Sequence, residues 1–131
     1  MAKKQQKKLS PQDKRIVNVF TDLGMPKNLA KTLIYISHVD ECRSSDIERG
    51  ANLRQPEVSV AMQELSKKGW ISRSNKKKEG KGRPIYIYKL ESSLYDIADQ
   101  FEKEKMLEIN TIKQDLDDLK GLLKNQQIQQ L

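Results

Sequence analysis

The chain has 131 residues, of which 36% are hydrophobic and 33% are charged, and it carries a formal net charge of +7 at pH 7. This length favours one compact domain with an extension, and the apolar content suits a modest core rather than a deep catalytic interior. No stretch is apolar for long enough to span a bilayer, and the basic start "MAKKQQKKLS" lacks the apolar segment that follows the cations of a secretory signal.

Charge is divided unevenly along the chain. Residues 1–90 contain 20 Lys and Arg against 9 Asp and Glu, a net charge of +11, whereas residues 91–131 contain 5 against 9, a net charge of −4. We therefore expect a basic disordered tail over residues 1–9, a basic domain over residues 10–90 and a separate acidic module after it. A polyanion such as nucleic acid would be attracted to the basic part only. A need for solubility explains the total charge but not this segregation.

Two amphipathic helices are predicted at the start of the domain. In "SPQDKRIVNVFTDLG", Ser10 can cap a helix that has proline at its first position and ends at Gly24. Residues 27–38 follow with an apolar stripe at helical spacing, which predicts a second helix. The stripe consists of Leu29, Leu33 and Ile36.

A short helix and a well-capped helix come next, separated by a tight turn. In "DECRSSDIERGANL", a brief extended piece near Cys42 and Arg43 can precede a helix capped by Ser44 or Ser45. In "RQPEVSVAMQELSKKG", proline lies in the first turn, and Gly69 ends the helix behind two lysines. Two helices joined in this way are typical of a helix-turn-helix.

The segment "WISRSNKKKEGKGRPIYIYKL" predicts a β-hairpin with a basic tip. Residues 70–74 and 84–90 have the composition of strands, and the polar loop between them contains two glycines. The faces of the second strand are left open, because Ile85 and Ile87 share one side and Tyr86 and Tyr88 the other. Crowded cations repel one another, whereas the same charges gain affinity beside a phosphate backbone. The candidate phosphate-binding residues of this hairpin are Arg73, Lys76, Lys77, Lys78, Lys81, Gly82 and Arg83.

From Ser92 onward the sequence predicts one long helix, because it contains no proline and only a late glycine. Apolar residues recur along it at alternating steps of three and four, which is typical of a coiled-coil seam. We expect a second copy of the chain to cover this seam, although the first turns, around Leu94 and Ile97, can instead dock within the chain. The candidate dimerisation residues are Phe101, Ile109, Ile112, Leu116, Leu119 and Leu123.

Little in the sequence points to catalysis. The only histidine, His38, and the only cysteine, Cys42, lie four residues apart with no third residue to orient them as base and nucleophile. The glycines of "EGKGRP" lack the Walker spacing, and no group of residues has the spacing of metal ligands. We expect no enzymatic activity, cofactor or metal, and assign His38 to the helix dipole. Cys42 cannot form an internal disulfide, so we expect a buried apolar side chain in a cytoplasmic protein.

The outward face of the capped helix is polar and carries no acid. Serine can reach a phosphate or a base edge, glutamine can pair with adenine, and Val60 can touch a thymine methyl. Glu57 and Glu64 fall on a flank, where they can bind basic side chains or accept from cytosine. Any amphipathic helix has a polar outer face, so this face alone does not indicate DNA binding. The basic hairpin that follows the helix strengthens the DNA-binding interpretation. The candidate DNA-binding residues here are Arg54, Gln55, Pro56, Ser59, Val60, Gln63 and Lys67.

The order helix, helix, short helix, capped helix, basic hairpin resembles the winged helix-turn-helix of MarR-like and TrmB-like regulators, which are common in archaea. The matching segments, within residues 10–90, are "SDIERGANL", "QPEVSVAMQELSKKGWI" and "GRPIYIYKL". The resemblance implies that residues 55–68 enter the major groove and that Gly82, Arg83 and nearby lysines meet the backbone or minor groove. It also implies dimerisation through a C-terminal helix. Unlike TrmB-like proteins, the chain has no large sugar-binding domain, so the resemblance assigns no effector.

The leading hypothesis is a homodimeric, sequence-specific DNA-binding transcriptional regulator, a repressor, with a mainly helical fold, a small β-hairpin and a long dimerisation helix. Double-stranded DNA and a second copy of the chain are the expected partners. An architectural chromatin protein that coats DNA with little sequence preference is a second hypothesis, and the ratio of specific to non-specific affinity separates the two. A third is a protein-interaction module, although the polar capped helix argues against a large apolar interface.

Overall fold

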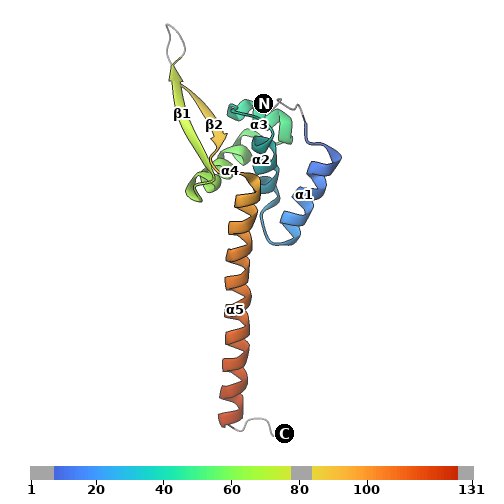
Figure 1. Ribbon diagram of the computed structural model, residues 1–131, viewed down its shortest axis with the longest axis vertical. Helices are drawn as coiled ribbons and strands as arrows, with labels where there is room; N and C mark the ends of the chain where they lie inside the picture. Colours follow the sequence, from blue (N-terminus) through green and yellow to red (C-terminus); the bar gives the residue numbers. More distant parts are fainter. Residues whose placement is uncertain (1–7, 78–83, 127–131) are drawn as a thin grey trace. The chain divides into compact units, whose positions relative to one another are not determined.

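The structure, a computed structural model, describes residues 8–77 and 84–126 (Figure 1). Over these residues it contains five helices and one two-stranded sheet, which confirms the predicted fold class. The chain divides into two units, residues 1–94 and 95–131, here called the N-terminal and C-terminal units. The elements in order are α1 (Pro11–Asp22), α2 (Lys27–Ser37), α3 (Ser44–Ala51), α4 (Gln55–Lys67), β1 (Ile71–Lys77), β2 (Pro84–Leu90) and α5 (Leu94–Gln126).

The first helix begins and ends as its sequence predicts. The Ser10 hydroxyl accepts a hydrogen bond from the Asp13 N–H at 3.1 Å, and the Asp13 carboxylate accepts one from the Ser10 N–H at 2.9 Å. This reciprocal pair is a capping box, which satisfies donors that the first turn leaves unpaired. Past the other end of α1, Gly24 has a φ of 108°, a conformation that glycine adopts without steric cost.

The start of α3 differs from the prediction. Ser44 and Ser45 are not caps; Ser44 is the first helical residue, and the extended Arg43 precedes it. The Asp46 carboxylate accepts the Arg43 N–H at 2.9 Å. The chain stays extended up to this point because Cys42 and Tyr88 exchange two backbone hydrogen bonds of 2.9 and 2.8 Å. The extended piece near Cys42 is thus confirmed, and it shifts the cap by one residue.

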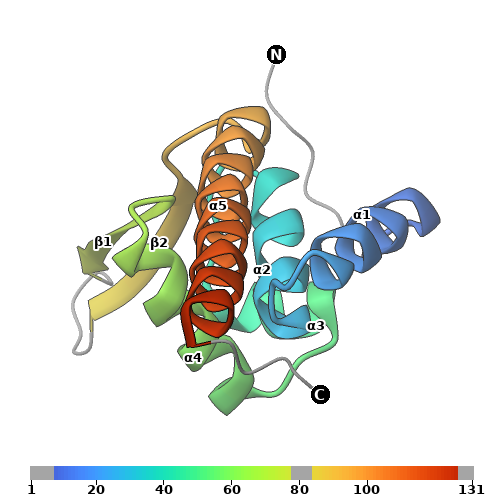
Figure 2. The ribbon, with the colours of Figure 1, turned by 90° about the horizontal axis from the view of Figure 1, so that it is seen from below.

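The core of the N-terminal unit is built around α2. This helix packs against α1, α3, α4 and β2, and Figure 2 shows it between α1 on one side and α4 with the hairpin on the other. Its Leu33, Ile34 and Ile36 are fully buried, and each such side chain contributes about 1.5–3 kcal/mol on burial. The ring of Tyr35 lies so close to Gly50 of α3 that no side chain fits at that position.

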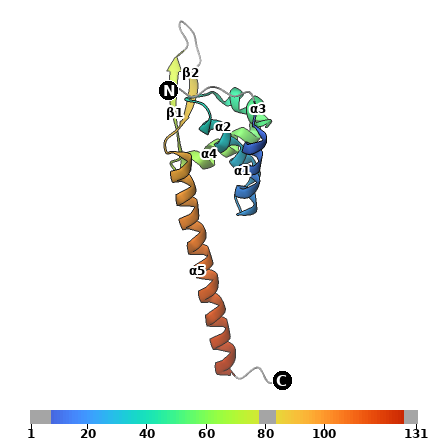
Figure 3. The ribbon, with the colours of Figure 1, turned by 45° about the vertical axis from the view of Figure 1, so that its right-hand side comes forward.

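The hairpin is longer on its first strand than predicted. β1 extends to Lys77 instead of ending near Ser74, and it pairs antiparallel with β2 from Ile71 opposite Leu90 to Lys77 opposite Pro84. β2 has β-branched and aromatic residues from Ile85 to Tyr88, and these residue types favour strand pairing. They hold the polar end of β1 in register with β2. β1 also packs against α4, as Figure 3 shows.

Of the C-terminal unit, the structure describes one continuous helix. α5 has 33 residues and is therefore about 50 Å long, which confirms the predicted long helix. Ile97 and Phe101 near its start are 0% and 8% exposed. The large apolar side chains from Met106 to Leu123 are exposed. Within the described ranges, no helix is both long and apolar enough to cross a membrane.

Candidate nucleic-acid interface

The helix α4 separates an apolar inner face from a polar outer face, as its period predicts. Val58, Ala61, Met62 and Leu65 are buried. The outer residues predicted from the sequence are all exposed, and Val60 is the most notable because an apolar side chain is left 63% exposed. The exposed set is Arg54, Gln55, Pro56, Ser59, Val60, Gln63 and Lys67. These side chains are free to meet a partner without disturbing the core.

The start of α4 is fixed by its own residues. Arg54 has extended backbone immediately before the helix, and its N–H donates to the Glu57 carboxylate at 2.8 Å. Glu57 therefore caps the helix, a role that the sequence interpretation did not assign to it. The negative charge also complements the positive end of the helix dipole. The Arg54 side chain remains exposed beside this first turn.

A groove of about 810 Å³ runs between α4 and the hairpin; it is here called the α4–hairpin groove. From α4 it is lined by four of the predicted residues, Gln55, Ser59, Gln63 and Lys67. Arg73 of β1 lines the same groove from the opposite side. The structure thus brings residues of the helix and the hairpin together, and among the described lining residues none is acidic.

The faces of β2, which the sequence left open, are settled by this groove. Tyr86 and Tyr88 line it together with Ile71 and Arg73 of β1, so the tyrosine face of the hairpin is turned toward α4. The Arg73 guanidinium lies over the Tyr86 ring, with its carbon 4.3 Å from the ring centre. Stacking of this kind holds the cation in place while its edge remains free to donate.

Four lining residues that carry a side-chain hydroxyl were missed by sequence reasoning; the other lining residues outside the prediction are the apolar Val58, Met62 and Ile71. Tyr86 and Tyr88 were named only as one of two possible strand faces, and Ser44 was assigned to a cap. Ser66 carried no signal of its own, although it lies three residues after Gln63 on the same helix. The missed residues are Ser44, Ser66, Tyr86 and Tyr88.

The tip of the hairpin lies outside the described residues. Lys78, Lys81, Gly82 and Arg83 fall in that gap, between the ranges 8–77 and 84–126. For Lys76 and Lys77, the structure gives the backbone pairing with β2. Arg73 is therefore the predicted hairpin cation whose side chain is placed by the structure.

His38 has a partner that its sequence position did not reveal. Its Nε2 lies 2.7 Å from an oxygen of the Asp13 carboxylate, which joins the end of α2 to the start of α1. Burial of Asp13 opposes ionisation, but hydrogen bonds from Ser10 and His38 outweigh it, and the pKa of Asp13 is lowered from its ordinary value of 3.8. The role of this pair is structural.

Cys42 is buried, as expected for an apolar side chain. Burial raises the pKa of its thiol to about 12, and the nearby carboxylates of Asp46 and Glu41 add to the shift. A thiol that stays protonated is a poor nucleophile. Over residues 8–77 and 84–126, no cluster of three or more His, Cys, Asp or Glu is arranged to hold a metal ion.

The seam predicted on α5 is exposed in the single chain. Ile109, Ile112, Leu116, Leu119 and Leu123 are each 42–57% exposed. Phe101, which the prediction added to this seam, is only 8% exposed and so offers little surface to a second copy. Lys105 lies over its ring, with the ammonium nitrogen 5.2 Å from the ring centre.

The fold is similar to that of several solved transcriptional regulators. One is described as a possible transcriptional regulator from Methanosarcina mazei Go1, with a TM-score of 0.61 and 19% identity over 76% of this chain and 83% of that chain. Another is a MarR family regulator from Silicibacter pomeroyi, with a TM-score of 0.52 and 16% identity over 91% of this chain and 84% of that one. At such identities the likeness shows the winged-helix fold and leaves function to be argued from the site.

The sequence itself matches no protein-family model, and no curated protein matches it significantly.

Proposed function

We propose that the chain is a homodimeric DNA-binding transcriptional regulator. In this proposal, α4 enters the major groove and the hairpin lies against the adjacent backbone, with Arg73 beside the phosphates. The observation that carries the proposal is the α4–hairpin groove, in which exposed Gln63, Lys67 and Arg73 face the same space. An α-helix fits the major groove, and glutamine can read adenine there through two hydrogen bonds.

The charge of the N-terminal part supports a nucleic-acid partner. Residues 1–90 carry a net charge of +11, and a duplex carries one phosphate for about every 1.7 Å of its length. Displacement of counterions by lysine and arginine supplies sequence-independent affinity. Base contacts from α4 would add specificity.

Dimerisation through α5 is proposed from its exposed seam. Five apolar side chains repeat at the spacing of a left-handed coiled coil, and each is 42–57% exposed. Pairing of two α5 helices would bury these residues. Two DNA-binding units held together in this way would contact two half-sites, and the regulator would repress by occupying them.

Selection of bound fragments from a random DNA pool tests the proposal. We expect enrichment of a motif with two related half-sites at fixed spacing, because a symmetric dimer reads a symmetric site. Retention of DNA without an enriched motif would favour the architectural chromatin protein. If no DNA is retained at low salt, the DNA-binding proposal is wrong.

A further inference from the structure

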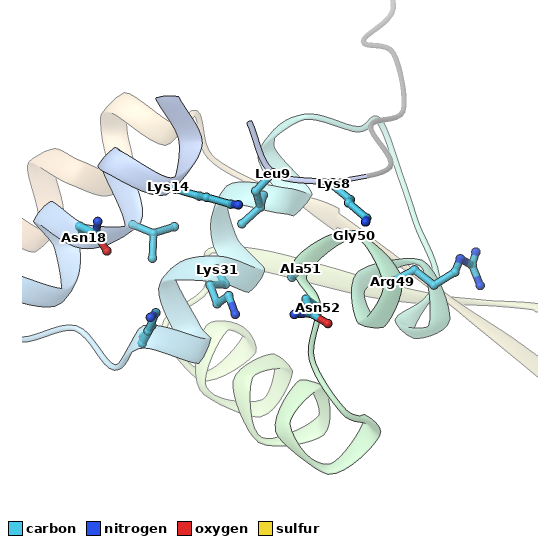
Figure 4. Close-up of a pocket in the computed structure, with 11 residues that line it drawn as sticks. Lys8, Leu9, Lys14, Asn18, Lys31, Arg49, Gly50, Ala51 and Asn52 are labelled. Atoms are coloured by element: carbon cyan, nitrogen blue, oxygen red, sulfur yellow. The ribbon is translucent and has the colours of Figure 1, made fainter. Parts of the chain in front are cut away.

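A second hollow of the N-terminal unit, here called the basic cavity, shares no residue with the α4–hairpin groove. It is surrounded by α1, α2, the end of α3 and the segment that precedes α1 (Figure 4). Its volume is about 550 Å³, which falls in the range of small-molecule sites, about 300–1,000 Å³. Its cations are Lys8, Lys14, Lys27, Lys31 and Arg49, and no acidic residue is found among its described lining residues.

The four lysines of the basic cavity are not neutralised by carboxylates. Arg49, in contrast, is neutralised, because its Nη2 lies 2.9 Å from the Asp46 carboxylate. Figure 4 shows its side chain directed away from the lysines. Within the described ranges, none of the four lysines has an ion-pair partner. Lys27 is also the first residue of α2, whose first turn has no acid. The dipole of α2 therefore adds to the positive potential instead of offsetting it.

The rest of the lining suits an organic molecule more than a bare inorganic ion. Leu9, Val17 and Ala51 form an apolar wall of the cavity, but each is at most 8% exposed, so this wall offers only a small contact area. Asn18 and Asn52 bring exposed amides, each of which both donates and accepts hydrogen bonds. Asn52 ends α3 in a left-handed conformation with a φ of 57°, so the backbone fixes the point from which its amide extends.

We propose that the basic cavity binds a soluble organic phosphate that carries two or more phosphate groups and is about the size of a nucleoside triphosphate. Lysines bind phosphate as point charges, and a polyanion relieves their mutual repulsion. The exposed amides of Asn18 and Asn52 contact the organic part. This site is independent of the proposed DNA binding, because it uses other residues. The same cations can meet the phosphates of a duplex instead, but a concave cavity favours a free molecule over the convex backbone of DNA.

Isothermal titration calorimetry of the full chain tests this site. The probes are ATP and inorganic tripolyphosphate, at about 0.15 M salt, where weak surface attraction is screened. We expect saturable binding of both at one site per chain, with ATP the tighter because its nucleoside can form hydrogen bonds with the two amides. Lys27→Gln with Lys31→Gln should weaken both by about tenfold or more. Glutamine keeps the helix propensity of lysine, and circular dichroism checks folding.

A matched control removes two cations elsewhere. Lys103→Gln with Lys124→Gln changes exposed residues of α5 and should leave ATP binding unaltered. Lys14→Gln, in α1, is a second test variant and should also weaken ATP binding. It keeps the test valid if the two substitutions in α2 impair folding. Binding that does not saturate, or equal losses in the two double variants, would overturn the proposal.

A DNA titration of the same variants, without nucleotide, separates the two sources of phosphate. The proposal is supported if the Lys27→Gln, Lys31→Gln variant binds DNA as tightly as the control variant does but no longer binds ATP and tripolyphosphate. A specific loss of DNA affinity in the Lys27→Gln, Lys31→Gln variant, with no ATP binding by the unaltered chain, assigns the cations to the duplex and refutes the proposal.

Discussion

The two units of the chain bury their apolar residues to very different degrees. In the N-terminal unit, Leu33, Ile47, Leu65 and Trp70 are at most 1% exposed. Along α5, the apolar residues from Met106 onward remain 42–67% exposed. The first unit has a core of its own, whereas the second presents a surface that gains stability only when something covers it. Charge follows the same division, since the first unit is basic and the second acidic.

The largest expected effect is in the core of the N-terminal unit. Leu33→Ala removes a fully buried side chain and should lower the free energy of unfolding by about 2–5 kcal/mol, because a cavity remains. Urea denaturation measures this change. Leu122→Ala, the same substitution at an exposed residue of α5 outside the seam, should change it by less than about 0.5 kcal/mol. Equal losses would remove the contrast between the units.

The second prediction concerns the seam of α5. Leu116→Asp places a charge where two helices are proposed to pair, and we expect the dissociation constant of the dimer to rise by about a hundredfold or more. Sedimentation equilibrium over a range of concentrations measures it. Thr111→Asp adds the same charge outside the seam and should leave the dimer intact. A monomeric unaltered chain at all concentrations would contradict the role given to α5.

The hairpin comes third. Replacing Lys76, Lys77 and Lys78 by alanine should lower affinity for all DNA sequences by roughly one to two orders of magnitude. The slope of log affinity against log salt should flatten by about 0.9 for each phosphate that the variant no longer neutralises. Fluorescence anisotropy at several salt concentrations gives both quantities. An unchanged slope would exclude these three lysines from the interface.

A smaller and more selective effect is expected from Gln63→Ala. It should weaken binding to selected sites by about 1–3 kcal/mol while leaving random DNA almost unaffected, because glutamine is proposed to read a base. Gln12→Ala, at an exposed residue of α1, is the control. Equal losses on both kinds of DNA would mean that Gln63 reads no base.

The smallest effect is on the pH dependence of stability. The pKa of Asp13 is lower in the folded chain than its ordinary value of 3.8. The ionised carboxylate therefore stabilises the fold fully above pH 3.8, and this stabilisation is lost as the pH falls through the folded pKa. The difference in unfolding free energy between the unaltered chain and Asp13→Asn should therefore shrink below about pH 4. Denaturation between pH 6 and 3 checks it. A difference that is constant over this range would show that Asp13 does not contribute through its charge.

Features that depend on local sequence were predicted well. The caps of α1, the outward face of α4 and the length of α5 follow from residue spacing, since helix periodicity is a local property. The extra residues of β1 were not predicted, because the strand partner rather than its own polar sequence decides where it ends. The start of α3 was misplaced by one residue because the pairing of Cys42 with Tyr88 joins distant segments.

The candidate DNA-binding site was predicted only in part, because sequence patterns report local structure and not the contacts between distant segments. The α4 residues of the groove could be predicted from one helix, but Tyr86 and Tyr88 could not, since both faces of β2 carry large apolar or aromatic side chains. The hydrogen bond between His38 and Asp13 spans 25 residues, and neither residue has a neighbour in sequence that indicates it. The basic cavity collects lysines from three separate segments, so their proximity emerges only in the folded chain.

The central claim is that α4 and the hairpin form one DNA-binding surface. An NMR titration of the isotope-labelled chain with a duplex recovered from the random pool tests it most directly. We expect the largest shifts of backbone amide signals at Gln55, Ser59, Gln63, Lys67 and Arg73, with α5 beyond Met106 unchanged. Shifts confined to α1 and α2, or shifts in α4 without any in the hairpin, would contradict it.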